Sequence, residues 1–144
     1  MLPPGAVRTN TLTGTTGNDI LNAPGSVATL VQGLPGNDTI TLVLAGEVAD
    51  AGEGNDIIRL ATGSVGSLAN TIGGGLGNDT IEFGTAGSPV ALFSGSVGGA
   101  SGADLINLSV GTLNGAFIGG GVGNDTLVLS AGSVVNTSVQ LGDN

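Results

Sequence analysis

Six aspartates recur along the chain, each at the same place in a short run that is rich in glycine. Successive members of the set are 19, 18, 23, 25 and 21 residues apart. The six are Asp19, Asp38, Asp56, Asp79, Asp104 and Asp125. A glycine stands two residues before each of them, and five of them directly follow an Asn. Carboxylates repeated beside flexible backbone offer oxygen atoms alone, and oxygen atoms are the ligands that hard cations prefer.

Residues that commonly perform nucleophilic or acid–base catalysis are missing from the sequence. There is no His and no Cys, and the only basic residues are Arg8 and Arg59. Serines such as Ser64, Ser67 and Ser94 lie in turns containing Gly and Ser, without a base to activate them. We therefore expect no enzymatic activity from this chain.

Acidic residues outnumber basic ones by 11 to 2, so the net charge is −9. A chain with so few cationic groups has no basic patch, and we expect neither nucleic acid nor an anionic membrane surface as a partner. No apolar run approaches the roughly 18 residues of a membrane span, so we also expect no membrane insertion. Cations are the natural partners. Because only 9% of the residues are charged, the surface must consist of Thr, Ser, Asn and Gly, or be covered by other copies of the protein.

Apolar and polar residues alternate after each of the six aspartates. The second residue after the Asp is a large aliphatic one: Leu21, Ile40, Ile58, Ile81, Ile106 or Leu127. The fourth is apolar as well: Ala23, Leu42, Leu60, Phe83, Leu108 or Leu129. The residue between them is mostly polar: Asn22, Thr41, Arg59, Glu82, Asn107 or Val128. Because side chains alternate along a strand, this pattern predicts a β-strand with both apolar columns on one face.

A second apolar stretch precedes each following loop, as at residues 27–31 and 134–139. A unit of about 20 residues therefore reads as loop, strand, far turn and second strand. One such unit cannot bury its aliphatic face, whereas stacked units bury a continuous core. The sequence predicts an all-β fold, a β-solenoid of about six coils over residues 11–144, preceded by an extended leader over residues 1–10. The Asp loops should lie along one side, because the far turns carry no regular Asp.

The loops resemble the calcium-binding nonapeptide of the RTX (repeats-in-toxin) or hemolysin-type family, G-G-x-G-x-D-x-U-x, in which U is a large aliphatic residue. Residues 74–82 and 120–128 match it fully, and the other units keep the fourth Gly, the Asp and the aliphatic residue. Six matches in register make the resemblance specific, and they cover nearly the whole chain. The resemblance implies a right-handed, parallel, β-roll-like solenoid. Because the motif occurs once per coil, it implies calcium along one side only.

The resemblance also implies how calcium is held. About five Ca²⁺ ions would lie between adjacent loops, since six loops provide five gaps. The six aspartates are the expected side-chain ligands, and backbone carbonyls of the Gly-rich stretches are expected to complete each site. These carbonyls are expected near Gly14, Gly17, Gly33, Gly36, Gly52, Gly54, Gly75, Gly77, Gly102, Gly121 and Gly123.

A simpler interpretation is that Gly-Asn-Asp only forms turns. Asn tolerates the left-handed conformation and Asp caps its own backbone, so either residue suits a turn without an ion. This interpretation explains one loop better than six. Aspartates stacked about 5 Å apart repel by roughly 0.8 kcal/mol per pair in water and ~3 kcal/mol at an effective dielectric constant of 20. A row of carboxylates therefore favours calcium.

The remaining polar residues of the loops and turns are assigned other roles. Asn is expected to be a choice of backbone conformation rather than a ligand, at Asn18, Asn37, Asn55, Asn78 and Asn124. Four acidic residues fall outside the ligand position and are expected to be solvated: Glu47, Asp50, Glu53 and Glu82. Asp143 is displaced by one position and is left out of the ligand set.

The function that follows is a calcium-binding structural protein that folds when calcium binds, outside the cell or on a bacterial cell surface. An S-layer unit, a filament or an adhesin segment would fit, and open strand edges favour a homo-oligomer or head-to-tail polymer. The alternative is a C-terminal RTX folding and export module of a larger secreted enzyme or toxin. An ice-binding solenoid ranks last, because the outward column of side chains is irregular.

Overall fold

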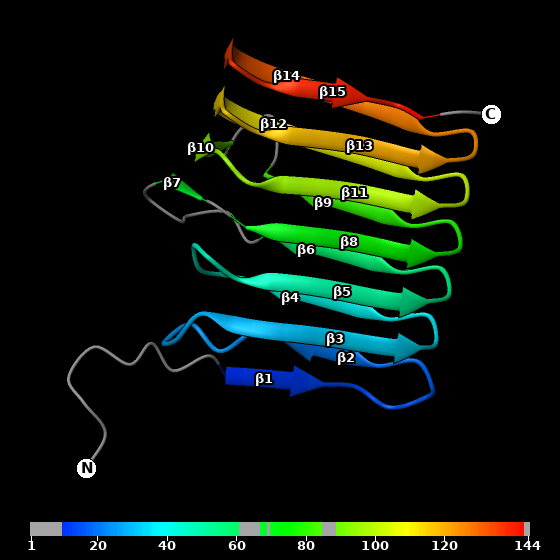
Figure 1. The fold of residues 1–144 in the computed structure, drawn as a ribbon. Coiled ribbons are helices and arrows are strands. Elements are labelled where there is room, and N and C mark those ends of the chain that lie inside the picture. Colours follow the sequence, from blue (N-terminus) through cyan, green and yellow to red (C-terminus); the bar gives the residue numbers. More distant parts are fainter. Residues whose placement is uncertain (1–9, 61–66, 69, 85–88, 143–144) are drawn as a thin grey trace.

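The alternating segments form strands, and the strands form two parallel sheets that lie face to face (Figure 1). The computed structural model describes residues 10–60, 67–68, 70–84 and 89–142. Seven strands make the first sheet, in the order β1 (Asn10–Thr13), β3 (Thr29–Pro35), β5 (Val48–Glu53), β8 (Thr71–Leu76), β11 (Ser96–Ser101), β13 (Phe117–Val122) and β15 (Ser138–Gln140). The second sheet has the order β2 (Ile20–Asn22), β4 (Thr39–Leu42), β6 (Ile57–Leu60), β9 (Thr80–Phe83), β12 (Leu105–Asn114), β10 (Val90–Phe93) and β7 (Ser67–Leu68), and β14 (Thr126–Val135) pairs with β12. The described residues contain no helix, and hence none that could cross a bilayer.

Successive coils are stacked in register. Val31 of the first sheet lies beside Ala49, and Ala49 lies beside Ile72. The predicted all-β solenoid of about six stacked turns is confirmed. The Asp loops lie together along one side, where each first-sheet strand passes into a second-sheet strand (right in Figure 1). We number them loops 1 to 6, and each has six positions: residues 14–19, 33–38, 51–56, 74–79, 99–104 and 120–125.

Differences in coil length are accommodated away from the loops. The early coils are short, and β2 and β4 have three and four residues. In later coils β12 and β14 have ten residues each. The first half of β12 pairs with β9 and its second half with β10, so β9 and β10 together form one interrupted layer. The loops can therefore stay in register although the coils differ in length.

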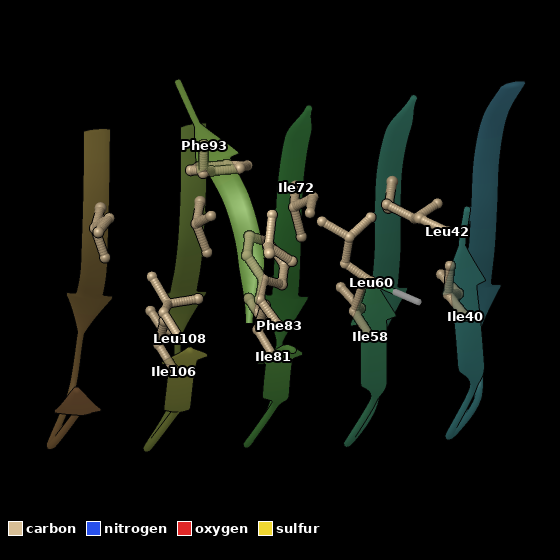
Figure 2. Packing of buried hydrophobic residues seen from close by; sticks show 14 of the residues in the cluster. Ile40, Leu42, Ile58, Leu60, Ile72, Ile81, Phe83, Phe93, Ile106 and Leu108 are labelled. Atoms are coloured by element: carbon tan, nitrogen blue, oxygen red, sulfur yellow. The ribbon is translucent and has the colours of Figure 1, made fainter. Parts of the chain in front are cut away.

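One apolar core runs between the two sheets. The two predicted columns are buried in the first five coils, from Leu21 and Ala23 through Ile106 and Leu108. Figure 2 shows the side chains of successive coils following one another along the stack. Phe83 and Phe93 lie edge to face with ring centroids 5.0 Å apart, and both are fully buried. Thin layers of aliphatic residues, with one aromatic pair, thus make the core.

The column between the apolar ones faces outward, as predicted. Asn22, Arg59 and Asn107 are exposed. Arg59 Nε donates to Glu82 Oε2 at 3.0 Å across β6 and β9. Both side chains are substantially exposed, so this ion pair contributes little to stability.

The sixth coil departs from the predicted burial. Leu127 is only partly buried, and Leu129, Val134 and Val135 of β14 are 37%, 52% and 44% exposed. The described residues contain no further second-sheet layer beyond β14, so nothing there covers these side chains. At the other end, residues 1–9 of the predicted leader lie outside the described residues, and Asn10 already begins β1.

Candidate metal centre

Each loop turns the chain from the first sheet into the second within a few residues. In loop 4, between β8 and β9, Gly75 and Gly77 have φ angles of 111° and 120°. These angles lie in a region that glycine enters freely and other residues avoid. Leu34 and Ala100, at the second position of loops 2 and 5, nevertheless have φ of 74° and 86°. The stack therefore imposes the loop path even where the local sequence disfavours it.

The six aspartates form one column along the stack. In each of loops 2 to 6, Asp Oδ1 accepts a hydrogen bond from the backbone N–H of the Asp in the preceding loop. The five donor–acceptor distances are 2.8 Å for Asp19 to Asp38, 2.7 Å for Asp38 to Asp56, 2.8 Å for Asp56 to Asp79, 2.8 Å for Asp79 to Asp104 and 3.0 Å for Asp104 to Asp125. One carboxylate oxygen of each Asp in loops 2 to 6 thus joins its loop to the preceding one.

The asparagines join the loops in the opposite direction. Asn18 Oδ1 accepts the backbone N–H of Asn37 at 2.8 Å, and Asn55 Oδ1 accepts that of Asn78 at 2.7 Å. Asn37 Oδ1 accepts the backbone N–H of Asn55 in loop 3, and Asn78 Oδ1 accepts that of Ala103 in loop 5. None of the loop asparagines has a positive φ. Asn was expected as a choice of backbone conformation, but no loop Asn has the left-handed backbone that this residue tolerates. In loops 1 to 4 its side chain instead bridges to the next loop.

The second carboxylate oxygen is left without a partner in five of the six loops. Oδ2 is buried and accepts no hydrogen bond at Asp38, Asp56, Asp79, Asp104 and Asp125. Loop 1 is the exception, because Asp19 Oδ2 accepts hydrogen bonds from Thr15 N at 2.6 Å and Thr15 Oγ1 at 2.9 Å. A buried carboxylate oxygen without a partner is costly. Four of these atoms lie between successive loops, and Asp125 Oδ2 lies between loop 6 and Leu141. A cation bound beside them would compensate their charge.

In five of the six loops, the glycine at the first position lies close to Oδ2 of the aspartate of the same loop. A carbon placed on the α-carbon of Gly14 would lie 2.5 Å from Gly33 O and 2.8 Å from Asp19 Oδ2. The first-position glycines of loops 2, 4, 5 and 6 show the same arrangement. A carbon added to any of them would lie close to Oδ2 of the Asp in the same loop and to the carbonyl oxygen of the first-position residue in the next coil. Calcium lies about 2.3–2.6 Å from its oxygen ligands. A carboxylate oxygen and a carbonyl oxygen therefore face each first-position glycine so closely that a side chain there would meet both.

Further carbonyls face the same gaps from the other side. A carbon added to Gly36 would lie 2.5 Å from Gly17 O, and one added to Gly52 would meet Leu34 O. The carbonyls of positions two and four thus face the following loop, whereas those of position one face the preceding loop. No three Asp, Glu, His or Cys side chains cluster within the described residues. A cation here would depend mainly on backbone oxygens, as the loop glycines allow.

Without a cation, the central carboxylates are in unfavourable surroundings. Burial away from water raises the pKa of Asp79 to about 7, the backbone hydrogen bond from Asp56 lowers it, and the charges of Asp56 and Asp104 raise it further. Burial is also the main reason that the pKa values of Asp56 and Asp104 are raised. The three central carboxylates therefore hold protons more tightly in the metal-free fold than they would in water.

The calcium-free protein should be more stable at pH 4 than at pH 8. A folded-state pKa above the unfolded value means that the folded chain holds protons more tightly. This stabilisation is complete below about pH 4 and is lost as the pH rises through the raised value of about 7. Circular dichroism of the calcium-stripped protein across this range measures the folded fraction. Stability that is unchanged or rises between pH 4 and pH 8 would contradict the prediction.

One acidic residue outside the loops was misjudged from the sequence. Glu47, expected to be solvated, is completely buried in the far turn between β4 and β5. Its Oε2 accepts the backbone N–H groups of Val43 at 2.7 Å and Leu44 at 2.9 Å. Asp50 and Glu53 are exposed, as expected. Asp143 lies outside the described residues.

Comparison with known proteins identifies the loop type. The family model of the RTX calcium-binding nonapeptide repeat (4 copies) matches residues 5–23 and 66–86, which contain loops 1 and 4. The search of curated proteins found no match, and neither did the search of solved structures. The family match and the stacked solenoid agree with the resemblance seen in the sequence.

Proposed function

We propose that this chain is an extracellular structural rod that folds around a row of Ca²⁺ ions, because two stretches of it match the RTX calcium-binding repeat and its strands stack as a solenoid. The observation that carries the proposal is the set of five buried, unpartnered Oδ2 atoms in register. The proposed ligands are the six loop aspartates, together with first-, second- and fourth-position carbonyls. When bound, calcium supplies positive charge between the stacked carboxylates.

Folding coupled to calcium suits a protein that works outside the cell. The chain would pass unfolded through a calcium-poor interior and fold in calcium-rich surroundings. Catalysis is not part of the proposed role, since an RTX repeat solenoid is a non-catalytic repeat domain. The extended leader over residues 1–10 and the solenoid over residues 11–144 are proposed as the two parts of the chain.

The proposed structural role includes head-to-tail association, as in an S-layer or filament. Its support is β14, whose only strand partner among the described residues is β12. This strand exposes Val128, Leu129, Val134 and Val135. A strand with one unpaired edge and exposed aliphatic residues is a template for a further layer, which a second copy can provide. In the rival role, an export module of a larger secreted protein, another part of that protein would provide the layer.

Calcium titration with electron microscopy tests the proposal. We expect calorimetry to show several Ca²⁺ ions bound per chain, with much weaker binding of Mg²⁺, which demands a tighter octahedral site. In calcium, the full chain should form extended assemblies that dissolve on chelation. A chain that binds no calcium would refute the whole proposal. Calcium-bound monomers at high protein concentration would refute the assembly role and favour the export module.

A further inference from the structure

Loop 3 differs from the other five loops at its first position. Ala51 stands there, whereas the others have glycine. Ala51 is 0% exposed and belongs to the buried apolar cluster. Its methyl group is therefore held inside the stack.

The other loops show what a carbon at this position meets. At Gly99 it would collide with Asp104 Oδ2 and lie 2.5 Å from Gly120 O, and at Gly120 it would collide with Asp125 Oδ2 and lie 2.6 Å from Leu141 O. These two kinds of oxygen are the ones that would hold a cation. In five loops the position is free of side-chain carbon. In loop 3 a real methyl group projects from it.

Building on the proposed function, we propose that the Ala51 methyl group blocks the cation site between loops 3 and 4, so that the calcium row is divided into two groups. One group lies between loops 1 and 3, and the other begins between loops 4 and 5. Asp56 Oδ2, in the blocked gap, is buried and unpartnered, and a methyl group cannot coordinate it.

Loops 3 and 4 stay closely stacked beside Ala51, and the carboxylate of Asp56 is buried between them. Asp56 is 1% exposed, so its carboxylate cannot turn into solvent in this arrangement. Loops 3 and 4 are held together by the bond from Asp56 N to Asp79 Oδ1 at 2.8 Å and the bond from Asn78 N to Asn55 Oδ1 at 2.7 Å. These hydrogen bonds keep the stack continuous across the gap. The chain remains one rod in which the ions form two groups.

The test compares the number of calcium ions bound by three full-length proteins. Ala51→Gly removes the methyl group, and Gly99→Ala adds one at the equivalent position of loop 5. Gly99 has no positive φ, so Ala is compatible with its backbone conformation, but the added methyl group would displace Asp104 Oδ2 or Gly120 O. Equilibrium dialysis at saturating calcium should give one ion more per chain for Ala51→Gly and one ion fewer for Gly99→Ala, relative to the parent. Circular dichroism at the same calcium concentration confirms that all three are folded.

The outcomes separate this inference from the function on which it rests. Equal ion numbers in the parent and Ala51→Gly, with a loss in Gly99→Ala, overturn the inference alone. No calcium bound by any of the three proteins overturns the proposed function as well. A second measurement needs no variant: metal density between Asp56 and Gly74 O, in a crystal of the parent grown with calcium, overturns the inference.

Discussion

Stripping calcium from the protein at pH 8 is expected to abolish most of its β-sheet circular dichroism signal, and restoring calcium is expected to bring it back. The core is thin, and five buried carboxylate oxygens are unpartnered without an ion. A ligand at 100 times its Kd stabilises the folded state by about 2.7 kcal/mol per site. Domains are stable by only about 5–15 kcal/mol. A few such sites therefore decide whether the solenoid is folded.

Magnesium provides the control for this experiment. Loops built from fixed backbone carbonyls should not satisfy its near-ideal octahedral geometry, with bonds of about 2.0–2.1 Å. Magnesium at the same ionic strength should therefore restore little of the signal. A strand spectrum that is identical in excess chelator and in calcium would show that the loops are ordinary turns.

The variant Asp79→Asn is expected to change stability in opposite directions with and without calcium. In calcium it removes a charged ligand from the middle of the row, and we expect the calcium concentration at half-folding to rise about tenfold or more, which corresponds to about 1.4 kcal/mol. Without calcium at pH 8 it removes a buried charge whose pKa is raised to about 7. Since one pKa unit corresponds to about 1.4 kcal/mol, the calcium-free variant should be more stable than the parent by roughly 2–4 kcal/mol.

Asp19→Asn is the matched control for this change. Asp19 is only half-buried, and its Oδ2 already accepts two hydrogen bonds from Thr15. Its replacement should therefore have a smaller effect under both conditions. Urea unfolding of both variants, with calcium and with chelator, provides the comparison. Equal shifts for the two variants would contradict the assignment of the central column as the main cation site.

Local patterning made most of the fold predictable. Ile40 and Leu42 alternate with polar neighbours, and that alternation predicts a strand with one buried face. The stacking of coils followed from the inability of one coil to bury that face. Loop positions followed from the recurring Asp. Each of these inferences depends on residues close together in the sequence, where the physical rule is simple.

Features that depend on contacts between coils were not predictable in the same way. Asn55 was assigned to a backbone conformation, because its acceptor role depends on the N–H of Asn78 in the next loop. Glu47 was expected to be solvated, because the two N–H groups that it caps are visible only once the turn is built. The proposed steric role of Ala51 depends on oxygens of the next coil, whereas a change from Gly to Ala looks conservative in the sequence of a repeat. A regular Asn in most loops was the one sequence signal that could have suggested a ladder.

The constant loop side and the variable far side make the rod suitable for engineering. From one loop aspartate to the next the separation ranges from 18 to 25 residues, while paired strands keep neighbouring coils aligned. Segments grafted into the far turns would therefore be displayed at a fixed spacing of about 4.8 Å per coil. Because the fold is expected to depend on calcium bound at the loops, changing the calcium concentration would switch this ordered display on or off.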